Sequence, residues 1–168
     1  VTLTTDNASA TMPSGTTFTT TVDDTSYQFV TVSDITQTTS GGKIIFTDVP
    51  VYEGTYITSK YIVDTSDVEQ RFILGDVRAD TSTLTVKVQT SATDTTTTTY
   101  TKVTDISQLT TTSEVYYLQE VEGGRFEVYF GDDVVSKGLS DGNIVQLNYV
   151  VTNKTLANGA SSFSSPSS

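Results

Sequence analysis

Alternation of apolar and polar residues with a period of two runs through most of this chain and points to β-strands throughout. Phe18, Thr20 and Val22, for example, alternate with Thr19 and Thr21. Because neighbouring side chains of a strand point to opposite faces, each such run predicts a strand with one buried face. The 3.6-residue period of amphipathic helices is nearly absent. Thirty-five of the 168 residues are Thr, whose branched Cβ also favours strands.

Turn sequences rich in Gly, Asp, Asn and Pro separate these runs at short intervals, as in antiparallel proteins. The sequence therefore predicts an all-β fold, an antiparallel β-sandwich or meander of one or two β lobes, with at most short helical turns. Asp105–Leu109 is the clearest such turn, with Asp105 as its cap. The turn sequences are Pro13–Gly15, Asp23–Asp24, Gly41–Gly42, Gly75–Asp76, Gly123–Gly124, Gly131–Asp133 and Asp141–Asn143.

The segment from Val115 to Phe130 has the pattern of a β-hairpin. Gly123-Gly124 supplies the positive φ angles of a tight two-residue turn. The return strand places Phe126, Val128 and Phe130 on one face. A further strand is predicted over 143–151, with Val145, Leu147, Tyr149 and Val151 along one side.

The length of 168 residues suits one sizeable domain or two small ones. Pro50 and Gly54 mark the candidate junction, which predicts an N-terminal β lobe over 1–53 and a sandwich-like lobe over 54–155. A Ser-rich flexible tail is expected over 156–168. Because the chain opens directly into alternating residues at Val1, we expect it to be a piece of a longer protein.

The composition excludes several kinds of chemistry. The chain has no Cys, His or Trp, so disulfides, Cys/His zinc sites and His- or Cys-based catalysis are ruled out, and no cofactor is predicted. Nine Lys and Arg against twenty Asp and Glu give a net charge of −11, which disfavours binding to nucleic acid. No stretch approaches the roughly 20 apolar residues of a membrane span, so no membrane partner is predicted.

Two arrangements that could serve catalysis are better explained as structure. Ser59-Lys60 and Ser136-Lys137 are adjacent pairs whose side chains would point to opposite strand faces. Glu120 and Glu122 share one face of the first strand of the predicted hairpin, and Glu127 lies just across it, as paired carboxylates of a glycosidase would. Sugar sites usually also offer a stacking Trp, which this chain lacks, and Arg125 could simply pair with these acids. The prediction is that the protein is not an enzyme.

Three aspartates in two turns have the oxygen chemistry that calcium prefers. They are Asp132, Asp133 and Asp141. Their spacing does not match an EF-hand loop, and Asp is common in turns because its side chain accepts hydrogen bonds from nearby backbone N–H groups. Ordinary turn acids are therefore favoured over a metal site, and no metal ligand is predicted.

An ordered series of short strings resembles a known structural family, the baseplate wedge subunit of T-even-like contractile-tail bacteriophages, a relative of the baseplate J proteins. One departure is Asp133, because the family often has Gly after the Gly-Asp pair. The matching strings are Val49–Thr55, Gln70–Leu74, Asp80–Val86, Tyr117–Glu120, Gly124–Asp132, Leu139–Asn143 and Ala157–Ala160.

The resemblance implies an internal, β-rich fragment of a structural virion protein with no catalytic residues. It implies a place in the tail baseplate, assembly in the host cytoplasm, and contacts with other wedge subunits or with copies of the same chain. Tyr supplies large, rigid contact area at interfaces, although it also packs in cores. The tyrosines expected to serve packing or contacts are Tyr52, Tyr56, Tyr116, Tyr129 and Tyr149.

Two other classes fit the composition. A Thr-rich β module of a bacterial surface adhesin or stalk is the main alternative, and an isopeptide bond in such a module would lower the intact mass by about 17 Da, the loss of one ammonia. A carbohydrate-binding module would present a row of exposed aromatic side chains, but the absence of Trp disfavours it.

Overall fold

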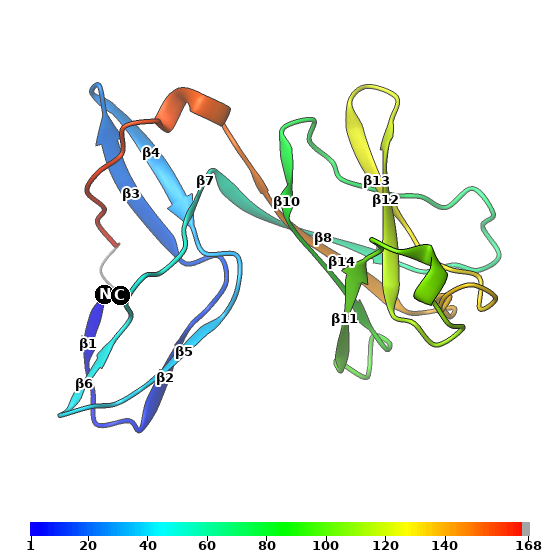
Figure 1. The fold of residues 1–168 in the computed structure, drawn as a ribbon, viewed down its shortest axis with the longest axis horizontal. Helices are drawn as coiled ribbons and strands as arrows, with labels where there is room; N and C mark the ends of the chain where they lie inside the picture. Colours follow the sequence, from blue (N-terminus) through cyan, green and yellow to red (C-terminus); the bar gives the residue numbers. More distant parts are fainter. Residues whose placement is uncertain (166–168) are drawn as a thin grey trace. The chain divides into compact units, whose positions relative to one another are not determined.

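The computed structural model describes residues 1–165 and confirms the all-β prediction, with two short 3₁₀ turns as its helical elements in that range (Figure 1). The chain divides into two compact units. Unit 1 comprises Val1–Tyr56 together with the described residues from Thr152 onward, and unit 2 comprises Ile57–Val151. Unit 2 is therefore an insertion in the sequence of unit 1. The lobe boundaries expected from the sequence stay predictions, and the end of the predicted tail, 166–168, lies outside the described residues.

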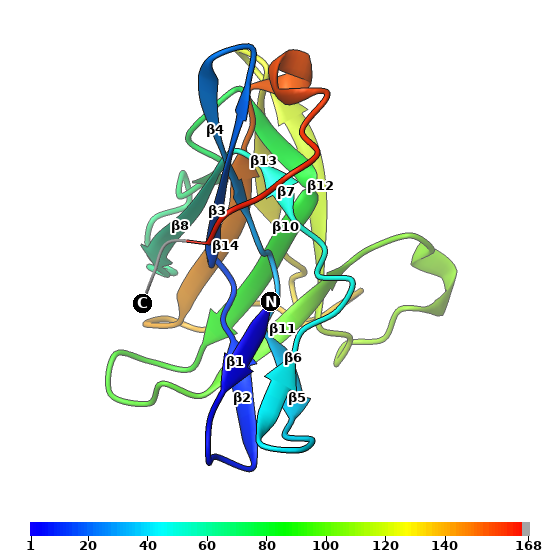
Figure 2. The same ribbon diagram turned by 90° about the vertical axis from the view of Figure 1, so that its left-hand side faces the viewer.

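Unit 1 contains three small antiparallel sheets, β1-β6, β2-β5 and β3-β4-β7, and Figure 2 shows the first two side by side. Each is too small to stand alone, so they share one core of buried apolar side chains. That core is built from Met12, Phe18, Ile44 and Phe46. The strands are β1 (Thr2–Thr4), β2 (Ser9–Met12), β3 (Thr17–Val22), β4 (Thr25–Val30), β5 (Ile35–Thr38), β6 (Lys43–Ile45) and β7 (Tyr52–Glu53).

The chain returns to unit 1 after unit 2 and lies along β3 and β4. A 3₁₀ turn, η2 (Lys154–Ala157), follows the crossing. Farther on, Ser164 forms a β-bridge with Thr19, with backbone hydrogen bonds of 2.8 and 2.9 Å. The ring of Phe163 meets that of Phe29 edge-on, with centroids 5.0 Å apart. Residues up to Ser164 therefore add apolar and backbone contacts to unit 1.

Unit 2 is built on one seven-stranded sheet with the order β8-β14-β10-β11-β12-β13-β9. Its other regular element is the 3₁₀ turn η1 (Ile106–Gln108). The strands are β8 (Thr55–Ile62), which begins in unit 1, β9 (Phe72–Ile73), β10 (Ala79–Gln89), β11 (Thr97–Lys102), β12 (Val115–Val121), β13 (Arg125–Tyr129) and β14 (Ile144–Val151).

One pair in this sheet departs from the predicted antiparallel pattern. Strands β11 and β12 run parallel, with Thr101 opposite Val115 and Lys102 opposite Tyr116. Parallel neighbours need a crossover rather than a tight turn, and the segment 103–114, which contains η1, provides it. The predicted cap of η1 is confirmed, because the Asp105 carboxylate accepts a hydrogen bond from the Ser107 amide at 2.9 Å.

The sheet curls until it is nearly closed like a barrel. Its edge strands, β8 and β9, are bridged by Tyr61, whose hydroxyl donates to the Ile73 carbonyl at 2.6 Å. The Tyr61 ring also meets Phe72 edge-on at 5.6 Å between centroids. The curl encloses a core that includes Leu74, Val86, Val128, Val145, Leu147 and Tyr149.

The predicted hairpin is confirmed as β12 and β13, with a longer turn than expected. Val121 pairs with Arg125, so three residues rather than two connect the strands. Gly123 and Gly124 both adopt positive φ, 81° and 71°. Because Cβ strongly disfavours that region, the two glycines are required here.

Candidate interaction surface

The five tyrosines singled out from the sequence occupy different environments. Tyr116 and Tyr149 are buried in the core of unit 2, where they pack rather than face a partner. Tyr56 is half-buried, and its ring lies against Gly15, whose added Cβ would be 3.2 Å from the ring edge. Tyr52 on β7 and Tyr129 on β13 keep 37% and 41% of their surface exposed. Only these last two have the exposure that a contact residue needs.

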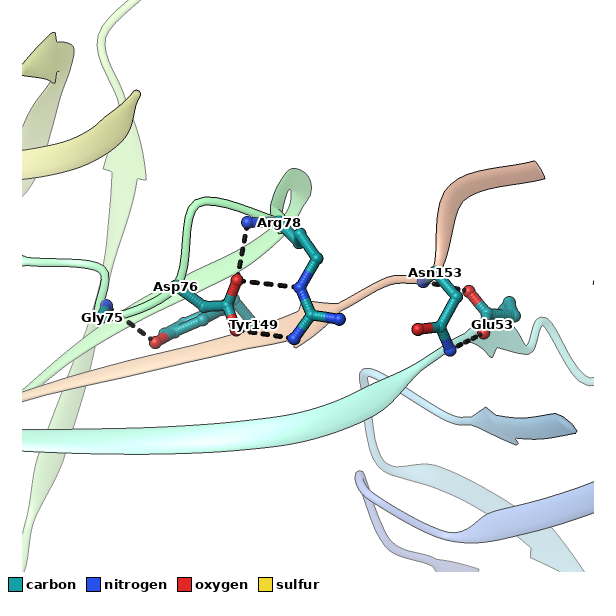
Figure 3. A network of polar contacts seen from close by, with 6 residues as sticks. All are labelled: Glu53, Gly75, Asp76, Arg78, Tyr149 and Asn153. Atoms are coloured by element: carbon teal, nitrogen blue, oxygen red, sulfur yellow. Dashed lines mark hydrogen bonds and ion pairs between the residues drawn. The ribbon is translucent and has the colours of Figure 1, made fainter. Parts of the chain in front are cut away.

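The hydroxyl of Tyr149 has a structural task. It accepts a hydrogen bond from the Gly75 amide at 3.1 Å, as Figure 3 shows. Just beyond Gly75, the carboxylate of Asp76 accepts two bonds from the guanidinium of Arg78 and one from the Arg78 amide. The turn that leads into β10 is thereby tied to the core through Tyr149 and ordered by its own charged pair.

Tyr129 belongs to an aromatic pair on the outer face of the hairpin. It stands opposite Tyr117 in the register, and the two rings stack with centroids 5.0 Å apart and an angle of 16° between planes. The Tyr117 hydroxyl lies 3.3 Å from the Oγ of the buried Ser136. Tyr129 is therefore held rigid by its neighbour, which lowers the entropy that it would lose on contact with a partner.

Beside the tyrosine pair lies an ion pair that the sequence did not reveal. The Arg71 guanidinium donates to both carboxylate oxygens of Glu127, at 2.8 and 2.7 Å, and Gln119 donates to the same group at 2.9 Å. The Glu127 side chain is only 9% exposed, so its charge needs these donors. Arg125, the partner expected from the sequence, does not take this role. The Arg71 bonds hold the pKa of Glu127 below its usual value.

This ion pair makes a pH dependence testable. Because the folded-state pKa of Glu127 is lowered, the unfolded chain binds the proton more tightly, and stability is lost as pH falls below about 4.5, the usual value, toward the folded pKa. Other aspartates also make the protein less stable as the pH falls. The contribution of Glu127 is therefore isolated by comparing the unchanged protein with the Arg71→Gln variant. We expect the variant to be less stable at pH 7 and to lose less stability between pH 7 and pH 3, measured by urea denaturation at each pH.

The control for that comparison is Arg125→Gln on the same hairpin. Among the described residues Arg125 has no ion-pair partner, so this change should leave the pH dependence as in the unchanged protein. If Arg71→Gln and the unchanged protein lose the same amount of stability as the pH falls, the ion pair with Arg71 does not lower the pKa of Glu127.

The three turn aspartates accept backbone hydrogen bonds. Asp132 accepts from the amides of Val134 and Val135, Asp133 from that of Gly138 at 2.8 Å, and Asp141 from that of Thr65 at 3.2 Å. These are the tasks of ordinary turn acids. Within residues 1–165 no group of three or more acidic side chains is arranged to hold a metal ion.

Glu53 carries a second polar cluster, inside unit 1. Its carboxylate accepts hydrogen bonds from the Thr152 hydroxyl, the Asn153 amide and the Asn153 side-chain amide, each at 2.8 Å. Figure 3 shows Asn153 facing this carboxylate. Glu53 comes shortly before the chain leaves unit 1, and Thr152 is the first residue after its return. The two crossings are thus fastened to one another by a single side chain.

None of the helical turns in the described part of the chain is long and apolar enough to cross a membrane.

Comparison with known proteins identifies the family. No curated protein matches the sequence. The family model of the bacteriophage baseplate wedge protein gp6, third domain, matches residues 58–160, which is more than half of the chain and contains nearly all of unit 2. The chain therefore belongs to the baseplate wedge protein gp6 family of bacteriophages, through the third domain of that protein.

Proposed function

We propose that this chain acts through protein–protein contacts with other baseplate wedge subunits, or with copies of itself, during baseplate assembly. Membership of the gp6 family supports a structural role in the virion tail baseplate. The observation that carries the proposal is the match of the family model to residues 58–160. This range covers all of unit 2 except its first residue. The same match favours a baseplate component over an adhesin or stalk module.

The surface of the protein supports a role based on contact. An acidic surface with net charge −11 keeps an unassembled subunit soluble and complements basic patches on partners. Tyr129 and Tyr52 are exposed aromatic side chains of the kind enriched at interfaces. We propose assembly in the host cytoplasm, non-enzymatic action, and Tyr52, Tyr56, Tyr116, Tyr129 and Tyr149 as the tyrosines that pack within the subunit or contact neighbours.

Co-purification tests the proposal directly. The protein is tagged, mixed with each purified wedge subunit of the same phage, and passed through size-exclusion chromatography with light scattering. We expect a stoichiometric complex with at least one wedge subunit, or a defined self-assembly, at physiological salt. If the chain stays monomeric with every wedge subunit and with itself, the proposed contact role fails.

A further inference from the structure

The chain turns sharply at the end of η2, over residues 157–160. The Ala160 amide donates to the Ala157 carbonyl at 3.3 Å and closes the turn. Asn158 has φ −61° and ψ 134°, and Gly159 has φ 102°. These angles are close to those of a type II β-turn, whose third position favours Gly because φ is positive there. Asn158 and Gly159 therefore occupy the two central positions of a type II turn.

The peptide group between Asn158 and Gly159 is open to solvent. The central peptide of a β-turn takes no part in the hydrogen bond that closes the turn. Both residues are exposed, and within residues 1–165 neither the Gly159 amide nor the Asn158 side chain makes a hydrogen bond. A Cβ added to Gly159 would meet Val22 at 3.9 Å, so the turn is also uncrowded.

This arrangement leaves the Asn158 side chain open to attack by the next peptide nitrogen. When the Gly159 amide loses its proton to solvent, its nitrogen can form a bond to Cγ of Asn158. The Cγ–Nδ2 bond then breaks, and the nitrogen takes up a proton and leaves as ammonia. Water opens the resulting succinimide ring at either carbonyl, which gives aspartate or isoaspartate. Gly favours the attack because it has no Cβ to shield its nitrogen and its backbone rotates freely.

Other sites of related sequence are held by hydrogen bonds. Asn158 is the one asparagine in the sequence that Gly follows, and Asp141-Gly142 is the one Asp-Gly pair. The Gly142 amide donates to the Val63 carbonyl at 2.9 Å, so its nitrogen is engaged. The Asn153 side chain donates to the Glu53 carboxylate at 2.8 Å and is fixed in place. Asn158 therefore combines the susceptible sequence with an unrestrained side chain.

We propose that Asn158 is a site of spontaneous deamidation, and that its isoaspartate product loosens the attachment of the following segment to unit 1. An isoaspartate linkage runs through the former side chain and adds one carbon to the main chain. The contacts downstream depend on the original spacing. Ser164 pairs with Thr19 through two backbone hydrogen bonds, and the ring of Phe163 meets that of Phe29 edge-on. The added carbon displaces these partners from one another.

Peptide mapping of the whole protein, incubated in buffer, tests the site. Trypsin cleaves after Lys137 and Lys154, so peptide 155–168 contains Asn158 as its one asparagine, and peptide 138–154 contains three of the others. We expect peptide 155–168 to gain about 1 Da, as an amide becomes a carboxyl group, and to separate into aspartate and isoaspartate forms. Peptide 138–154 should keep its mass over the same time. The gain should be faster at mildly alkaline pH, because the attack needs the deprotonated Gly159 amide.

Two controls show whether the turn leaves Asn158 reactive. Asn158→Gln keeps the amide but must close a larger ring, so its peptide 155–168 should keep its mass, and thermal unfolding checks that the variant folds. A synthetic peptide of residues 155–168 gives the rate without the fold, and the folded protein should react within a few-fold of it, because an exposed turn opens at little cost. If the folded protein reacts more than an order of magnitude more slowly than the peptide, or the variant gains the same mass, the assigned site is wrong.

Hydrogen exchange before and after incubation tests the effect on the segment. The Thr19 and Ser164 amides donate to one another's carbonyls at 2.8 and 2.9 Å, and both should exchange faster once isoaspartate has formed. The Leu74 amide of unit 2, which donates to the Phe126 carbonyl at 2.8 Å, is the control and should be unaffected. Equal exchange of Thr19 and Ser164 in the two samples would overturn the proposed loosening.

Discussion

Replacing Leu147 by Ala should lower the free energy of unfolding of unit 2 by roughly 3 kcal/mol. Leu147 is fully buried on β14, which has β8 on one side and β10 on the other, and it stands opposite the equally buried Val86. Removing three carbons here loses their transfer from water and leaves a cavity that strands hydrogen-bonded on both edges cannot close. Urea denaturation followed by far-UV circular dichroism measures the change.

The matched control is the same substitution at an exposed site. Leu156 lies on η2 in unit 1 and keeps most of its surface exposed, so Leu156→Ala should change the free energy of unfolding by less than about 0.5 kcal/mol. Equal losses at the two positions would mean that β14 is not the centre of the core.

The alternation of apolar and polar residues predicted those elements whose geometry depends only on residues close in the sequence. The hairpin between Val115 and Phe130 was predictable because alternation and Gly123-Gly124 define it without distant contacts. On β14 the same reasoning was incomplete: Val145, Leu147 and Tyr149 are buried as expected, but Asn148 and Val150 on the other face are buried too. Alternation along one strand predicts one buried face and does not encode what covers the second.

The candidate surfaces were harder to predict than the strands. Glu127 and Arg71 are 56 positions apart, so nothing in the hairpin pattern identified Arg71 as the partner. Tyr116 and Tyr129 have similar local sequence, yet one is buried and the other exposed. Strand alternation gives the two faces but not which face is covered, and the covering elements come from elsewhere in the chain.

The loop after β13 depends on a glycine for a reason other than its φ angle, and Gly131→Ala should destabilise unit 2 by about 3 kcal/mol. A Cβ on Gly131 would lie 2.2 Å from the Oγ and 2.3 Å from the backbone oxygen of Ser136. Ser136 cannot easily move, because it is fully buried and its carbonyl accepts the Asp133 amide at 2.9 Å. Thermal and urea unfolding measure the loss.

Gly75→Ala is the control for this substitution, because its Cβ would meet only the Tyr149 hydroxyl at 3.7 Å, an ordinary contact. If both variants keep the stability of the unchanged protein, the close packing of Gly131 on Ser136 is wrong. Asp133 in the same loop has a φ of 64°, in the left-handed region that Gly adopts most easily. Its carboxylate offsets part of that strain by accepting the Gly138 amide at 2.8 Å. The loop is therefore held by packing at Gly131 and by a side-chain bond at Asp133, and the cost of the Gly131 substitution comes from this packing.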